Sequence, residues 1–358
     1  MSRSTRGTRL AAVLASVLLL CGTVAACGSG TGSGGGSAPS AAEPSGAPGG
    51  GAFPVTIEHK YGGTTIAAAP KRIVTVGLTD QDSVLALGSV PVGTTEWLGG
   101  YKGAIGPWAT DRLGAAAAPV VLKDTGTGPQ VEKIASLAPD LIFALYSGLT
   151  KEQYATLSKI APVVAQPKDY ADYGVPWQRQ TEIIGRALGK EAEAEKLVAG
   201  VEAEFTAAKQ AHPEFDGATA VIATPYQGIF VYGPQDNRSR ILSSLGFTLP
   251  SGLQQAVGDQ FGANISKERT DLLDTGAIVW IVADPAADAA KLHKDKLYGD
   301  LKVVRQGREV FVKETGDYGN AFSFVSVLSL PYTLDRLAPQ LAAAVDGSPA
   351  TEVTEPAS

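Results

Sequence analysis

The sequence predicts an α/β protein of two lobes with mostly parallel sheets, bridged by one long α-helix, with a ligand cleft between the lobes. Short β-branched segments alternate with stretches of helical periodicity before residue 175, and the same alternation returns after residue 213. Between them, residues 176–212 carry apolar side chains mostly three or four positions apart, as in an amphipathic helix. No other segment connects the two alternating stretches, so we expect this helix alone to join the lobes.

The amino terminus has the pattern of an export signal. Three arginines precede an apolar run at 10–20, which is too short for a membrane span. Small residues then lead to Cys27, and this arrangement resembles the bacterial lipobox, in which the cysteine is lipidated. We therefore predict a lipoprotein signal peptide at 1–26 and a lipid anchor at Cys27 that holds the protein at the extracytoplasmic face of the cell membrane. The alternative is a plain secretory signal with an incidental cysteine.

The next segment is predicted to be a flexible tether. Residues 27–53 are mostly Gly, Ser, Ala, Pro and Thr, which bury too little apolar surface to offset the entropy of ordering the chain. Both cysteines precede residue 28, so the folded part would rely on a large core and not on disulfides. Without the signal arginines the chain has 27 basic and 36 acidic side chains, a formal charge of −9. This charge does not favour nucleic acid as a partner.

The first lobe is placed at 54–175. The apolar run at 140–145 is typical of a strand buried in a parallel sheet. The expected strands of this lobe lie at 72–76, 91–95, 120–122, 140–145 and 163–166, and the expected helices at 79–87, 131–137 and 151–160.

The linker helix region is placed at 176–212. Pro176 suits a first helical turn, where its missing N–H is not needed, and Pro213 closes the segment. Gly189 is expected to kink or split the helix. The part after Gly189 has about 22 residues and a length of roughly 33 Å at about 1.5 Å per residue.

The second lobe is placed at 213–347 and is followed by a polar tail at 348–358. Its expected strands lie at 218–224, 229–232 and 277–282, its hairpin at 305–313 with a turn through Gln306 and Gly307, and its helices at 240–245 and 334–345.

One spacing pattern occurs in both lobes. Glu132, Leu137 and Ile142 are five residues apart, and the same spacing returns between Glu268 and Ile278. In each copy an acidic helix start leads into a buried strand. The repetition favours two lobes of related design.

Several motifs follow one another across residues 54–346: KRIVTVG, VEKIASLAPDLIFAL, IGRALGKEAEAEKLV, SRILSSLGF, ISKERTDLLDTGAIVWIV and YGDLKVVRQGREVFV. Their order resembles the solute-binding lipoproteins of iron–siderophore ABC importers, a family that shares its fold with cobalamin and haem receptors. The resemblance implies a monomer that is not an enzyme, that binds a ferric siderophore between its lobes, and that delivers it to an ABC permease and its ATPase. It implies no intrinsic cofactor, because the siderophore holds the iron.

Ligands of open parallel sheets bind at the carboxyl ends of the strands. Without reference to the family, this rule selects as ligand-binding candidates Thr79, Asp80, Trp97, Tyr146 and Tyr226. Trp97 also belongs to a glycine-rich loop with Tyr101 and Trp108, and such a loop exposes large aromatics only where they cover something. They form either a satellite cluster over the first lobe or an aromatic wall against the organic shell of a chelate.

Two arginines of the second lobe are further candidates. Arg238 and Arg240 lie at or before a helix start, where the helix dipole does not stabilise a cation. They are either solvated surface residues or ligand contacts, and Arg238 is the nearer match to an arginine that meets chelate oxygens in the resembling family. Tyr318 matches a position where that family often has a cleft tyrosine.

The loop after residue 145 departs from the family pattern. Many members with anionic ligands have an arginine there, but here the loop begins with Tyr146 and Ser147. The departure slightly favours a neutral or cationic tris-hydroxamate over an anionic tris-catecholate.

Glu132 and Glu268 have two compatible interpretations. An acid in the first turn stabilises a helix by roughly 0.3–1 kcal/mol. In the resembling family, one glutamate on each lobe also meets arginines of the permease, and these two match that pattern.

Other functions are less well supported by the sequence. A direct receptor for zinc or manganese would gather His and carboxylate ligands, but the three histidines are dispersed at 59, 212 and 293. Haem would need an axial Tyr, and cobalamin would suit the same architecture. A surface-anchored hydrolase lacks support, because neither cysteine lies in the expected folded part and no histidine pairs obviously with a serine. A receptor that signals to a membrane sensor would use the same cleft.

Overall fold

The computed structural model describes residues 53–123 and 128–356. The predicted signal peptide, Cys27 and the tether up to residue 52 lie outside the described residues. None of the described helices is long and apolar enough to cross a membrane.

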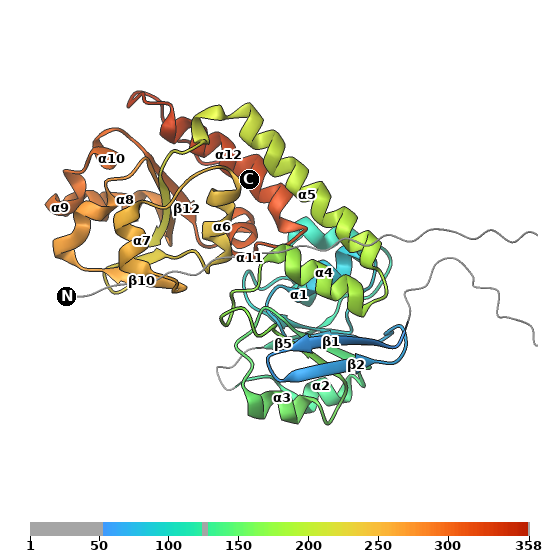
Figure 1. The fold of residues 1–358 in the computed structure, drawn as a ribbon. Helices are drawn as coiled ribbons and strands as arrows, with labels where there is room; N and C mark the ends of the chain where they lie inside the picture. Colours follow the sequence, from blue (N-terminus) through green and yellow to red (C-terminus); the bar gives the residue numbers. More distant parts are fainter. Residues whose placement is uncertain (1–52, 124–127, 357–358) are drawn as a thin grey trace, which may run out of the picture. The chain divides into compact units, whose positions relative to one another are not determined.

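The N-terminal lobe contains a five-stranded sheet in which all neighbouring strands are parallel (Figure 1). Parallel neighbours require crossover connections, and the alternation of strands and helices in the sequence provides them. In spatial order the strands are β5 (Val120–Lys123), β4 (Gly93–Glu96), β3 (Ile73–Thr75), β6 (Leu141–Ala144) and β7 (Val163–Ala165). The sequence pattern did not predict the separate antiparallel hairpin of β1 (Val55–His59) and β2 (Gly62–Ile66).

Helices cover both faces of this sheet. Helices α1 (Asp80–Ala86) and α4 (Trp177–Ala187) pack on one face, where Val84 and Ile184 are completely buried. Helices α2 (Val131–Ser136) and α3 (Lys151–Leu157) pack on the other (Figure 1). Two short 3-10 helices follow β4, η1 (Lys102–Ala104) and η2 (Pro107–Leu113).

The C-terminal lobe has a second five-stranded sheet with the same parallel centre and a different edge. Strand β11 pairs in parallel with β8 and with β12. Strand β9 pairs antiparallel with β8 and with β10. The spatial order is β10 (Gly262–Ile265), β9 (Ile229–Tyr232), β8 (Ala220–Thr224), β11 (Ala277–Val282) and β12 (Glu309–Lys313).

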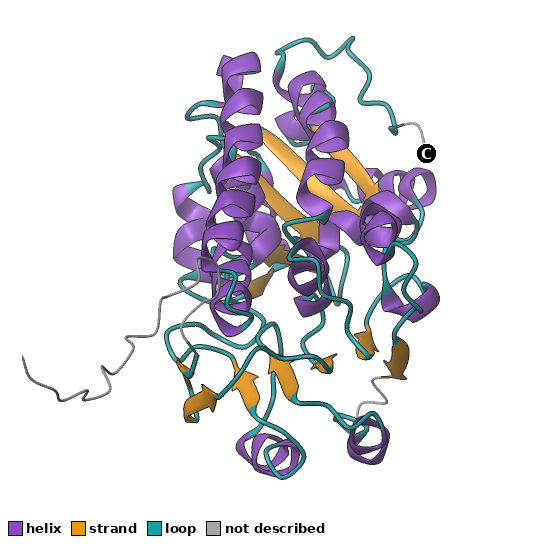
Figure 2. Cartoon of the chain, turned by 90° about the vertical axis from the view of Figure 1, so that its right-hand side faces the viewer, coloured by secondary structure: helices purple, strands orange, loops and turns teal. Residues whose placement is uncertain are grey.

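Helices also enclose this second sheet, as Figure 2 shows from the side. One core contains side chains of α5 (Glu191–Ala211), α6 (Asn237–Ser244), α11 (Asp317–Phe324) and α12 (Ser329–Val345). The other contains side chains of α7 (Ser251–Val257), the 3-10 helix η4 (Lys267–Leu273), α9 (Lys296–Gly299) and α10 (Lys302–Arg305). Helix α8 (Pro285–Lys294) and the short η3 (Pro213–Phe215) complete the lobe.

The prediction of a hairpin at 305–313 is wrong. Helix α10 ends here instead, and a single strand, β12, follows. Gly307 has a φ of 64°, and Arg308 N donates to Val303 O at 2.9 Å, so the glycine ends the helix. A left-handed glycine serves a helix end and a hairpin turn equally well, and the sequence alone does not separate the two.

The linker contains two helices, α4 and α5, because Gly189 divides it with a φ of 69°. The 21 residues of α5 belong to both lobes. Ala194 lies in the core of the N-terminal lobe, Val201 and Phe205 lie in the core of the C-terminal lobe, and Leu197 packs against both. The predicted bridging helix is therefore confirmed, and its two ends are each fixed in a different core.

The polar tail that follows α12 is not wholly free. Val353 packs against the core of the C-terminal lobe, and Gln340 of α12 donates to Thr354 O at 3.0 Å.

Candidate ligand-binding site

A cavity of about 630 Å³ is lined by residues of both lobes. Its N-terminal wall comes from the loop after β4, with Trp97 and Tyr101. Its C-terminal wall comes from β8, β9 and β11, from the start of α6, and from the segment that follows β12 and continues into α11. The polar and aromatic side chains of that second wall are Thr224, Tyr232, Arg238, Glu314, Thr315, Asp317, Asn320 and Ser323.

The N-terminal wall is aromatic. The Trp97 ring is partly exposed and lies 6.1 Å from Tyr146 and 5.4 Å from Phe324, measured between ring centres. Trp108 does not line this cavity; its Nε1 donates to Asp82 at 2.8 Å, and its ring packs on Phe324. Trp97 and Tyr101 thus line the cavity, whereas Trp108 packs against Phe324 of the other lobe.

Tyr101 connects the two walls by hydrogen bonds. Its hydroxyl donates to Asp317 Oδ1 at 2.8 Å and accepts from Asn320 Nδ2 at 2.8 Å. Burial raises the pKa of Tyr101 to about 12, and the Asp317 carboxylate adds to the shift. The phenol therefore stays protonated at neutral pH and can donate across the cavity.

Arg238 is held by Asp236 on the C-terminal wall. Its Nε donates to Asp236 Oδ1 at 2.9 Å, and its second terminal nitrogen donates to Oδ2 at 2.6 Å. The centre of the guanidinium lies 3.9 Å from the ring centre of Tyr232, in cation–π range. Burial disfavours the charged guanidinium, but the charge and hydrogen bonds of Asp236 raise the pKa of Arg238 above its ordinary value.

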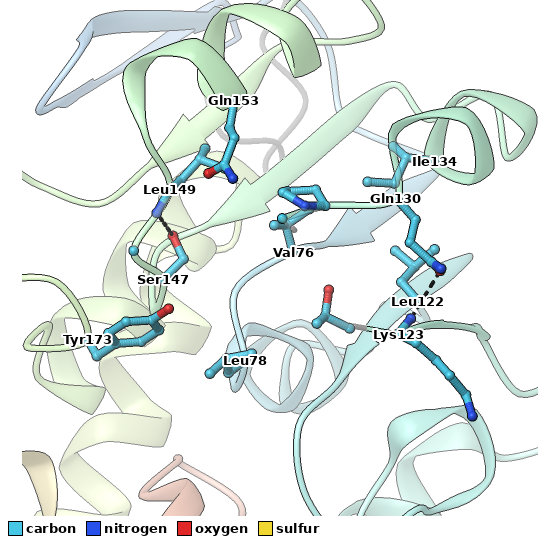
Figure 3. A pocket seen from close by; sticks show the side chains of 14 residues that line it. Val76, Leu78, Leu122, Lys123, Gln130, Ile134, Ser147, Leu149, Gln153 and Tyr173 are labelled. Carbon is cyan, nitrogen blue, oxygen red and sulfur yellow. Dashed lines mark hydrogen bonds between the residues drawn. The ribbon is translucent and has the colours of Figure 1, made fainter. Parts of the chain in front are cut away.

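A smaller pocket of about 220 Å³ lies in the N-terminal lobe, close to the carboxyl ends of its strands. Figure 3 shows Tyr173, Ser147 and Leu78 along one side of it, while the side chain of Lys123 extends away from them. Tyr146 lies between the two pockets, with ring centres 6.1 Å from Trp97 and 5.8 Å from Tyr173. The Tyr146 ring is only 4 % exposed, so it supports the aromatic wall from behind.

The structure corrects the prediction that Thr79 and Asp80 bind ligand. Both are completely buried. Asp80 accepts hydrogen bonds from the backbone N–H groups of Leu145 and Tyr146 and from Gln180, at 2.8 to 3.1 Å, and Gln180 also donates to Thr79. Burial raises the pKa of Asp80 to about 6, although these bonds oppose the rise. The two side chains fix the loops under the site and have no surface for a ligand.

Three further candidates also lie outside the cavity lining. Tyr226, on the turn between β8 and β9, is 59 % exposed and contacts neither pocket. Arg240 donates to Gly174 O at 2.7 Å, so it holds the segment before α4. Tyr318 donates to Gln340 Oε1 at 2.8 Å and packs against the C-terminal core. Of the eight candidates, Trp97 and Arg238 line the cavity, and Tyr146 lies behind Trp97.

Sequence reasoning missed Tyr232, Glu314, Asp317 and Asn320. The last three follow the carboxyl end of β12, so the strand-end rule would have found them if it had been applied to that strand. Tyr232 carries no comparable signal, because an aromatic residue in a strand is ordinarily a packing residue.

The arrangement suits recognition of a bulky organic ligand. Among the described residues, no three His, Cys, Asp or Glu side chains come close enough to hold a metal ion. Each histidine has another partner: His59 bonds to Thr64, His212 to Glu214 and His293 to Glu309.

Glu132 and Glu268 occupy equivalent positions in the two lobes. Both are exposed in the first turn of a short helix, α2 or η4, that precedes β6 or β11. Each of these strands lies next to the central strand of its sheet. Bonds with backbone and with Ser266 lower the pKa of Glu268.

Comparisons with known proteins agree with this architecture. A family model described as periplasmic binding protein matches residues 73–314. A putative ABC transporter substrate-binding lipoprotein of Bacillus subtilis, YhfQ, is 28 % identical over 304 residues, covering 82 % of this chain and 88 % of that protein. A periplasmic solute binding protein from Mycobacterium smegmatis has 36 % identity and a TM-score of 0.70, covering 81 % and 98 %. The iron-uptake protein PiaA of Streptococcus pneumoniae, solved with ferrichrome, has 27 % identity and a TM-score of 0.71, covering 82 % and 99 %.

Proposed function

Because the chain belongs to the periplasmic binding protein family, we propose that it is an extracytoplasmic receptor that binds a ferric siderophore and delivers it to an ABC importer permease. The observation that carries this proposal is the cavity of about 630 Å³ that both lobes line with aromatic and polar side chains. The similarity to a ferrichrome complex of PiaA supports a ferric chelate as the ligand. The chain acts in this proposal as a binder and not as an enzyme.

A hydroxamate siderophore is the ligand we favour. A ferric tris-hydroxamate presents a largely neutral organic shell, which suits contact with Trp97 and Tyr101. The loop after β6 contributes Tyr146 and Ser147 where an anionic chelate would gain from an arginine. The ligand-binding residues in this proposal are Trp97, with Tyr146 behind it, and Arg238.

Membrane attachment is part of the proposal. The signal peptide at 1–26, lipidation at Cys27 and the tether at 27–53 would hold the lobes, 54–175 and 213–347, outside the cell membrane. The names of YhfQ and of a probable siderophore-binding lipoprotein, YfiY, support this anchoring by analogy.

Glu132 and Glu268 are proposed as permease contacts. Their exposure and equivalent positions on separate lobes support this role, since a partner that meets both would sense the spacing of the lobes. Neither carboxylate is needed inside a core, so each is free to meet a cation of the permease.

The experiment that tests the function is a binding titration of the full-length protein in detergent, followed by intrinsic tryptophan fluorescence. Ferrichrome should quench the fluorescence, because Trp97 lines the cavity, and Trp97→Phe should remove most of the response. Trp280→Phe is the matched control, since Trp280 is completely buried in the C-terminal core. Ferric enterobactin, ferric citrate, haem and cobalamin complete the panel. A protein that binds haem or cobalamin but no ferric siderophore would refute the proposal.

A further inference from the structure

Arg238 is the one basic residue in the described lining of the 630 Å³ cavity. Ligand anions prefer the two-pronged edge of a guanidinium, where two parallel N–H groups meet two oxygens. Arg238 uses one such edge, formed by Nε and a terminal nitrogen, to bind both carboxylate oxygens of Asp236. The stacked Tyr232 ring covers one face of the same group.

Asp236 is held firmly in this position. Its side chain is 1 % exposed, and Oδ1 also accepts from the backbone N–H of Arg238 at 2.8 Å, which makes Asp236 the N-cap of α6. If the carboxylate turned away to release Arg238, a helix N–H would lose its partner as well. A ligand carboxylate or catecholate therefore competes with a carboxylate that is already in place.

The rest of the lining adds negative charge. Glu314 and Asp317 face the same cavity from the segment after β12. Together with Asp236 they set three acidic groups against the single Arg238. Two other cations lie outside this lining: Arg240 donates to the neutral acceptors Gly174 O, Asn237 Oδ1 and Gln235 Oε1, and Lys123 lines the smaller pocket instead (Figure 3).

We infer that this cavity selects ferric complexes of zero or positive charge and that Asp236 is the residue that sets the selection, by neutralising Arg238. The inference rests on the proposed function and specifies the charge class of its ligand. Three hydroxamates neutralise ferric iron, and a pendant ammonium makes the complex cationic, whereas citrate and catecholate complexes are anionic. Repulsion from Glu314 and Asp317 penalises the anionic complexes.

The test compares Asp236→Asn with the wild-type full-length protein in detergent. Asparagine keeps a side-chain oxygen that can cap α6, and it removes the negative charge that balances the charge of Arg238. The probes are ferrichrome, ferrioxamine B, ferric citrate and ferric enterobactin. Wild-type protein should bind the first two at least tenfold more tightly than the anionic pair. Asp236→Asn should raise the affinity for the anionic complexes by about tenfold. It should change the affinity for ferrichrome by no more than about threefold.

The matched control is Asp284→Asn, which changes the N-cap aspartate of α8, a residue outside the cavity. It should leave all four affinities unchanged. If Asp236→Asn fails to fold, the double variant Glu314→Gln with Asp317→Asn provides the second test. It should reduce the ratio of the affinity for neutral complexes to the affinity for anionic complexes about tenfold.

The outcomes separate the two proposals. Binding of ferric citrate by wild-type protein as tightly as ferrichrome overturns the charge selection and leaves siderophore binding intact. An unchanged ratio of affinities in Asp236→Asn overturns the role of Asp236. Failure of wild-type protein to bind any of the four complexes overturns the proposed function itself.

Discussion

The two lobes share a scaffold and differ in what they bring to the cavity. Both sheets have a parallel centre of corresponding strands, with β3 and β6 in one lobe matching β8 and β11 in the other. The N-terminal lobe supplies the aromatic side chains Trp97 and Tyr101, whereas the C-terminal lobe supplies most of the charge. A repeated fold thus does not require a repeated binding surface, because the loops at the strand ends vary independently of the core.

The lobes also place their buried acids at opposite edges. Asp80 bonds to the loop that follows β6, at the carboxyl edge that faces the site. In the C-terminal lobe, Glu309 begins β12 at the other edge and accepts from Tyr298 at 2.5 Å and from His293 at 2.8 Å. Asp80 therefore fixes the loops under its binding wall, whereas Glu309 does not line the cavity.

The largest expected effect comes from removing that acid. Asp80→Ala leaves the N–H donors of Leu145, Tyr146 and Gln180 without a partner, and we expect the free energy of unfolding to fall by about 4 kcal/mol. Ferrichrome affinity should fall as well, because the loops support Tyr146 and Trp97. Urea unfolding followed by circular dichroism and the fluorescence titration measure the two effects.

Glu309→Ala is the matched variant in the other lobe. It should destabilise the protein and leave ferrichrome affinity unchanged. Equal losses of affinity in the two variants would contradict the distinction between the lobes.

A smaller effect is expected on how stability depends on pH, through the ionisation of Asp82, which connects the lobes. Asp82 Oδ2 accepts from Trp108 and from Ser326 of the C-terminal lobe, while Oδ1 is buried without a partner. Burial raises the pKa of Asp82 from 3.8 to about 6, so the folded state holds this proton more tightly than the unfolded state. The stabilisation that comes from the protonated form of Asp82 is complete below pH 3.8 and is lost as pH rises through about 6.

Asp82→Asn should therefore be more stable than wild type at pH 7.5, by up to about 3 kcal/mol, and should lose this advantage towards pH 4. Thermal unfolding across that range measures the difference. Asp80→Asn is the contrast, because both Asp80 oxygens accept hydrogen bonds and an amide would turn an N–H towards a donor. An Asp82→Asn variant with the pH dependence of wild type would exclude Asp82 as the responsible group.

The smallest effect on the isolated protein is expected from replacing the exposed Glu132 and Glu268. Glu132→Gln and Glu268→Gln should leave the urea midpoint of unfolding almost unchanged, because both carboxylates are exposed at a helix start. Ferrichrome affinity should stay the same. Iron uptake by cells that depend on this receptor should fall, and more in the double variant than in either single one. Normal uptake in the double variant would leave both residues with a helix role only.

Much of the scaffold could be predicted from local patterns. The apolar run at 140–145 and its counterpart at 277–282 form inner strands, next to the central strand of each sheet, because a strand buried on both faces needs apolar residues at every position. The site was predicted less well. Among the loops that the strand-end rule selected, the one with Trp97 lines the cavity. Thr79 and Asp80 are buried, and Tyr318 donates to Gln340. Which side of a loop faces the ligand depends on contacts distant in sequence.

The sequence by itself determined the two lobes, their strand order along the chain and the helix that joins them, since these follow from periodicity and from glycine and proline positions within a few residues. Tertiary structure alone decided the charge of the cavity. Arg238 looks like a free cation in the sequence, and it becomes a neutralised pair only because the cap geometry of α6 places Asp236 against it. Electrostatic character depends on distances between side chains, and only the folded chain fixes those.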